Sequence, residues 1–165
     1  FAMRGYYYGR HSAKNLESAM IYPLYLGYPW LIRGYDNAAF NKQISSGGNP
    51  SIGPGQLMGN HMALTNLEVR FPFTGPERLT AIKSRLLFTE LTLFADAGIA
   101  WYNIDDVKLK WQTNKLNERI PIVSAGLSIR VNVFGMIILE PFYAIPFQLG
   151  GIKAATFGLN FTPGW

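Results

Sequence analysis

The side chains of this chain that could do chemistry are carboxylates and arginines. They are Glu68, Glu90 and Asp96, with Arg33, Arg70 and Arg130 as candidate partners. Carboxylates held near one another can act as general acids and bases, whereas carboxylates that face guanidinium groups form charge-assisted pairs. Ion pairing along the wall of an enclosed space is the better interpretation of this set.

Other catalytic and ligand-binding patterns are missing from the sequence. There is no Cys, which removes thiolate nucleophiles, thiolate metal sites and disulfides. His11 and His61 have no metal-ligand spacing around them, and no Gly-x-Ser-x-Gly or phosphate loop is present. The net charge of +5 is accompanied by no nucleic-acid-binding motif. We therefore expect no enzymatic activity, no metal, no cofactor and no nucleic-acid partner.

Most of these side chains lie on expected β-strands, because apolar and polar residues alternate along much of the chain. The alternation is clearest in 63–71, 90–101 and 123–133, and it places Glu68 and Asp96 on polar faces. The further strands expected are 1–10, 137–147 and a last strand that begins near 153 and runs to the C-terminus. Pro141 and Pro146 predict a bulge, a distortion or a strand end in the strand 137–147. The fold class is therefore all-β and antiparallel.

The opposite faces of these strands are apolar and carry no charge. The final strand ends in bulky residues with no later segment to cover them, and lipid covers such a face in a transmembrane β-barrel. No apolar run reaches the ~18 residues of a membrane helix. Aromatic and charged residues each make up 15% of the chain, so charge is scarce. We predict an antiparallel transmembrane β-barrel. A soluble β-sandwich binding module is a further alternative, and the uncharged faces disfavour it.

The connections between the expected strands differ in length. The segments 11–59 and 103–121 are long, while 134–135 and 148–151 are short. Barrels of this kind carry long loops outside the cell and short turns on the periplasmic side. Two connections are exceptions, since 72–86 is long for a periplasmic turn and 148–151 is short for an outer loop. Six strands cannot close a barrel, since the smallest have about 8. Phe1 reads as an internal start, so we expect the missing strands upstream, with assembly from several chains as the alternative.

Two short motifs resemble those of a known family. Leu31-Ile32-Arg33-Gly34-Tyr35 lies in the long loop, and Phe94-Ala95-Asp96-Ala97-Gly98 lies on the fourth strand from the end. In this order, before three more strands and a terminal aromatic, they resemble the bacterial surface-antigen superfamily. That superfamily includes barrel-assembly and translocation-and-assembly proteins (BamA/TamA-like) and two-partner secretion transporters. The resemblance covers 1–165, as the last six or so strands of a barrel of about sixteen strands.

The resemblance implies that the 11–59 loop folds into the barrel lumen and is held at its wall. The residues of this lock would be Arg33, Gly34, Tyr35, Glu68, Asp96 and Gly98. Arg33 would reach Asp96, with Glu68 as a second wall acid, because a planar guanidinium can take two carboxylates. Gly34 would let the loop turn close to the wall, and Gly98 would leave room for its tip.

The resemblance also assigns a role to the terminal strand. Its residues Phe157, Phe161, Pro163 and Trp165 would form the signal that the assembly machinery reads and one side of the barrel seam. Pro163 cannot donate to a strand ladder and is predicted to shorten pairing at the seam, while a simple strand end is the other interpretation.

The function that the resemblance implies is insertion, assembly or translocation of proteins at the bacterial outer membrane. The expected partners are outer-membrane lipid and lipopolysaccharide, together with other outer-membrane or periplasmic proteins. The alternative is a barrel that anchors a surface enzyme or an exported passenger domain encoded upstream.

Overall fold

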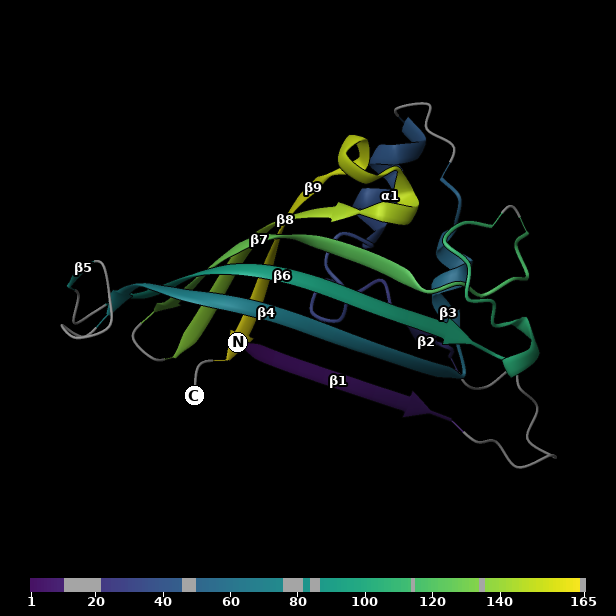
Figure 1. Cartoon of the computed structure of the whole chain (residues 1–165), viewed down its shortest axis with the longest axis horizontal. Coiled ribbons are helices and arrows are strands. Elements are labelled where there is room, and N and C mark those ends of the chain that lie inside the picture. Colours follow the sequence, from purple (N-terminus) through teal and green to yellow (C-terminus); the bar gives the residue numbers. More distant parts are fainter. Residues whose placement is uncertain are drawn as a thin grey trace.

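Six long strands form one antiparallel sheet in the computed structural model of the chain (Figure 1). The structure describes residues 1–10, 22–45, 50–75, 82–83, 87–113, 115–133 and 136–163. In order across the sheet the strands are β1 (Ala2–Gly9), β4 (His61–Gly75), β6 (Leu87–Trp101), β7 (Ile122–Val133), β8 (Ile137–Pro146) and β9 (Thr156–Pro163). This arrangement confirms the predicted all-β, antiparallel class.

The pairing register brings Glu68 and Asp96 close together. Asn66 on β4 pairs with Asp96 on β6, and Glu68 pairs with Phe94. Because side chains alternate between the two sides of a strand, Glu68 and Asp96 share one face of the sheet. Asp96 on this inner face is buried, while Leu67 on the opposite, outer face is about half exposed.

Some strand boundaries differ from those expected. Strand β4 ends at Gly75, later than predicted, so the connection predicted at 72–86 covers 76–86. This connection contains the short strand β5 (Ile82–Lys83), which pairs parallel to β4. Pro146 ends β8, and the pairing of β8 with β7 is interrupted at Pro141 without a change of register. The predicted turn at 134–135 and Trp165 lie outside the described residues.

The segment predicted as one long loop, 11–59, contains regular structure. It holds the two-stranded sheet of β2 (Leu24–Tyr25) and β3 (Met58–Gly59), the helix α1 (Asn37–Ser45) and the 3-10 turn η2 (Pro54–Leu57). Helix α1 is not predicted by the alternation in the sequence. Its signal was the Asp36 side chain, which caps the helix by accepting a 2.8 Å hydrogen bond from the Ala39 amide. Further 3-10 turns, η3 (Ile104–Asp106), η4 (Phe147–Leu149) and η5 (Gly151–Ala154), occupy the connections after β6 and β8.

The larger apolar core lies between this segment and the inner face of the sheet. We call the described part of it, residues 22–45 and 50–59, the inserted segment; Figure 1 shows it beside the curved sheet, with α1 near the start of β9. The buried residues that join the two parts include Leu26, Ile32, Tyr35, Phe40 and Leu57 from the inserted segment and Leu64, Ala100 and Ile122 from the sheet. The sheet thus buries one face against its own loop.

Both outermost strands of the sheet have a free side. Strand β1 pairs with β4 alone and β9 with β8 alone, so the sheet does not close within the described residues. In that same part of the chain, no helix has the length and apolarity to cross a membrane.

Gly126 on β7 tests how tightly the inner wall is packed. A Cβ at this position would lie 1.9 Å from the Tyr143 carbonyl oxygen and 2.8 Å from the Phe94 ring. We expect Gly126→Ala to lower the free energy of unfolding by about 1–3 kcal/mol in a denaturant titration, because backbone would have to move. Gly5→Ala on β1 is the control, since its Cβ meets only the Leu64 carbonyl oxygen at 3.9 Å. Equal losses for the two variants would contradict this packing.

Candidate functional site

The centre of the site is Arg33, in the stretch between β2 and α1. The chain turns just before it, where the amides of Leu31 and Ile32 donate to the Tyr28 carbonyl at 2.9 and 3.1 Å. Arg33 is only 3% exposed. Its Nε lies 2.8 Å from Oδ2 of Asp96 and its Nη2 lies 2.8 Å from Oδ1, while its backbone amide donates to Oδ2 at 3.2 Å. The guanidinium and the carboxylate therefore form a two-pronged pair.

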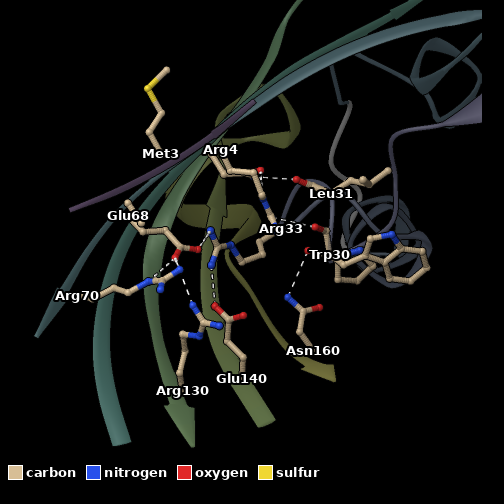
Figure 2. Close-up of a pocket in the computed structure, with 13 residues that line it drawn as sticks. Met3, Arg4, Trp30, Leu31, Arg33, Glu68, Arg70, Arg130, Glu140 and Asn160 are labelled. Carbon is tan, nitrogen blue, oxygen red and sulfur yellow. Dashed lines mark hydrogen bonds and ion pairs between the residues drawn. The ribbon is translucent and has the colours of Figure 1, made fainter. Parts of the chain in front are cut away.

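Two further carboxylates complete the coordination of Arg33 (Figure 2). Its Nη1 donates to Oε1 of Glu140 on β8 at 2.7 Å, and its Nη2 donates to Oε1 of Glu68 on β4 at 3.0 Å. Strands β4, β6 and β8 thus each contribute one acid. The structure brings together Arg33, Asp96 and Glu68, as the family resemblance implied, and adds Glu140.

Neighbouring side chains make further contacts with the three carboxylates. Arg70 donates to Oε2 of Glu68 at 2.9 and 2.7 Å, and Arg130 lies 3.6 Å from the same atom. Ser128 donates to Glu140 at 2.8 Å, and Asn66 donates to Asp96 at 2.8 Å. Three acids therefore face the three guanidinium groups of Arg33, Arg70 and Arg130, so the formal charges of this group balance.

The surroundings keep Arg33 charged. Burial by itself would lower the pKa of Arg33, but the hydrogen bonds and charge of Asp96, with the charges of Glu140 and Glu68, raise it above its ordinary value. The Phe94 ring also lies under the guanidinium, with the Arg33 Cζ 3.7 Å from the ring centroid. The site therefore holds a fixed, buried cation.

Two glycines let the inserted segment approach the inner face of the sheet closely. Gly34 has a φ of +89°, and a Cβ there would lie 2.9 Å from the Cβ of Ala144. At Gly98, a Cβ would lie 2.4 Å from Cδ1 of Ile32. The absence of a side chain at Gly98 therefore gives Ile32 its place beside Arg33.

Tyr35 fixes the other side of the turn. Its ring is fully buried, and its hydroxyl donates to the Val123 carbonyl at 2.8 Å and also contacts the Gln148 side chain. Burial raises the pKa of Tyr35 well above the ordinary value, although the hydrogen bonds with Gln148 and Val123 oppose this. Gln148 in turn accepts from the Val123 amide at 2.8 Å, so Tyr35 connects the inserted segment to the connection after β8.

Sequence reasoning missed part of this cluster. Alternation along 137–147 puts Glu140 on the polar face of its strand, and this signal could have added it to the lock. Phe94 and Asn66 also share the inner face, but alternation does not say which inward residues reach the inserted segment. Glu90 makes no hydrogen bond or ion pair with any arginine among the described residues.

The terminal strand is placed partly as expected. Phe157 and Phe161 point to the outer face and are 72% and 68% exposed. Pairing of β9 with β8 continues to the pair of Pro163 with Ile137, so Pro163 does not shorten that ladder. The side chain of Pro163 and the whole of Trp165 lie outside the described residues, and the signal and seam roles stay predictions.

A cavity of about 350 Å³ lies beside Arg33 on the inner face (Figure 2). Charged and polar side chains from several strands line it, with Trp30 from the inserted segment. No cluster of His, Asp and Glu that could hold a metal ion occurs among the described side chains.

Comparison with known proteins gives no relative. Neither a family model nor a curated protein nor a solved structure matches the chain.

Replacing Asp96 by Asn tests the lock. The change keeps the shape of the side chain but leaves the buried Arg33 with one carboxylate fewer, and we expect the free energy of unfolding to fall by about 3–5 kcal/mol. Limited proteolysis should then cut the inserted segment more readily. Arg70→Gln is the control, because this side chain is 38% exposed and its loss should cost under about 1 kcal/mol. If Asp96→Asn behaved like the control, Arg33 would not depend on Asp96.

Proposed function

We propose that this chain is the C-terminal part of an outer-membrane β-barrel of the surface-antigen superfamily, which inserts, assembles or translocates proteins at the bacterial outer membrane. The observation that carries the proposal is the division of the sheet into an apolar outer face and a charged inner face that is locked to an inserted loop. No enzymatic step is part of it.

The outer face supports a lipid environment. Its side chains on β4, β6, β7, β8 and β9 include no Asp, Glu, Lys or Arg. Many large apolar side chains on this face are 41–72% exposed, among them Leu67, Phe71, Phe73, Leu91, Leu93, Leu127, Ile129, Tyr143, Phe157, Leu159 and Phe161. A monomeric soluble protein rarely exposes an apolar patch that spans five strands, whereas a barrel wall presents one to lipid.

The inner face supports the rest of the proposal. Its charges lie where a barrel would have its lumen, and the Arg33 cluster fixes the inserted segment against them. A barrel whose lumen is filled in this way is a poor open pore. Its work on other proteins would therefore take place at its strand edges, or after the inserted segment has moved.

Leu127→Arg tests whether lipid covers the outer face. Leu127 is half exposed at the middle of β7, so in a soluble protein the change should cost little. In a bilayer we expect it to lower the free energy of unfolding by about 2–4 kcal/mol. Leu109→Arg, in a loop and 89% exposed, is the control and should be neutral in both settings. A chain that stays monodisperse without detergent and tolerates both changes would contradict the membrane assignment.

The proposed activity can be measured with the full-length protein in phospholipid vesicles. An unfolded outer-membrane barrel protein is added. Its folding is followed by the change of its electrophoretic mobility on a gel loaded with unheated samples. We expect faster folding than in empty vesicles. Vesicles that contain heat-inactivated protein are the control. Folding no faster than in empty vesicles would contradict an assembly role and leave the anchor as the better candidate.

A further inference from the structure

The backbone of the turn before Arg33 is bound residue by residue by side chains of the sheet. Three consecutive carbonyls each accept a hydrogen bond: Pro29 from Asn160 at 3.3 Å, Trp30 from Arg4 at 3.2 Å and Leu31 from Asn66 at 2.9 Å. The Arg33 amide then donates to Asp96. We call residues 28–33 the tip.

The donors come from opposite sides of the sheet. Asn160 lies on β9 and Arg4 on β1, which are the two outermost strands, and Figure 2 shows both side chains directed at the tip. Five strand-to-strand steps of about 4.8 Å would separate β1 and β9 by about 24 Å in a flat sheet. Two adjacent carbonyls can engage side chains from both strands only because the sheet curves around the tip.

The tip is also anchored in the interior of the sheet. The side-chain amide of Asn66 donates hydrogen bonds to the Leu31 carbonyl of the tip and to the Asp96 carboxylate. The side-chain oxygen of Asn66 accepts a 3.0 Å hydrogen bond from Nε of Arg4. Arg4 therefore contacts both the tip and the residue that supports the Arg33–Asp96 pair. A continuous set of hydrogen bonds runs from β1 through the tip to β9.

We infer that the tip is a brace that ties the two outermost strands to the Arg33 lock. Loss of a contact at one side of the sheet loosens the tip and thereby the strand on the opposite side. The consequence for activity rests on the proposed function: release of the lock would free β9, the strand at the seam. The residues involved act by positioning, because none of them touches a reacting group.

Amide hydrogen exchange of the full chain tests the brace. Arg4→Met keeps the length of the side chain but removes its donors, and we expect exchange of the tip amides and of the β9 amides that pair with β8 to rise about fivefold. Asn160→Leu should in turn raise exchange in β1. In the double variant, the increase in exchange should be smaller than the sum of the increases in the two single variants, because both changes act on one brace.

Two matched controls separate the brace from general damage. Arg10→Met removes an arginine that donates to the Tyr22 carbonyl of the inserted segment, outside the tip. Thr156→Val changes a buried residue of β9 that makes no hydrogen bond to the tip among the described residues. Neither should alter exchange on the opposite side of the sheet. Unchanged β9 exchange in Arg4→Met would overturn the brace. The measurement is made in detergent, or in buffer if the chain needs no detergent. Its result therefore tests the brace whether or not the membrane assignment is correct.

Discussion

The buried charge of Arg33 is the constraint on which the rest of the structure depends. Moving a guanidinium out of water costs several kcal/mol even after relaxation, and only close partners of opposite charge offset this. Asp96, Glu140 and Glu68 lie within 2.7–3.0 Å of it and come from three different strands. The lock therefore exists only when the sheet has its final curvature and register.

This constraint explains why the polarity of the molecule is divided as it is. The inner face needs acids, amides and hydroxyls to hold one loop, so its charges gather there, while the outer face is left with apolar residues. The apolar core between the sheet and the inserted segment buries apolar surface, and this burial stabilises the contact between the two in addition to the ion pairs. Glycines at 34 and 98 are needed where the loop and the wall approach most closely.

The lock and the edges of the sheet are one connected arrangement. Asn66 contacts both the tip and Asp96, and Arg4 contacts both the tip and Asn66. The position of the inserted segment and the curvature of the sheet therefore depend on each other. For a barrel that handles other proteins, such a dependence would couple what fills its lumen to the freedom of its strands.

Alternation in the sequence predicts the strands and their two faces, and the two motifs that resemble a known family predict the contacts of Arg33 with Asp96 and Glu68. Alternation has a period of two, so it assigns Glu68, Asp96 and Glu140 to one side without any knowledge of pairing. It could not say that Glu140 reaches Arg33 while Glu90 does not, because that depends on register between strands far apart in the chain. It also missed α1, whose short helix is stabilised by burial of Ala39 and Phe40. Contact of the tip with both outermost strands could not be predicted from the sequence, since curvature of a sheet is a property of all its strands together and leaves no local pattern in the sequence.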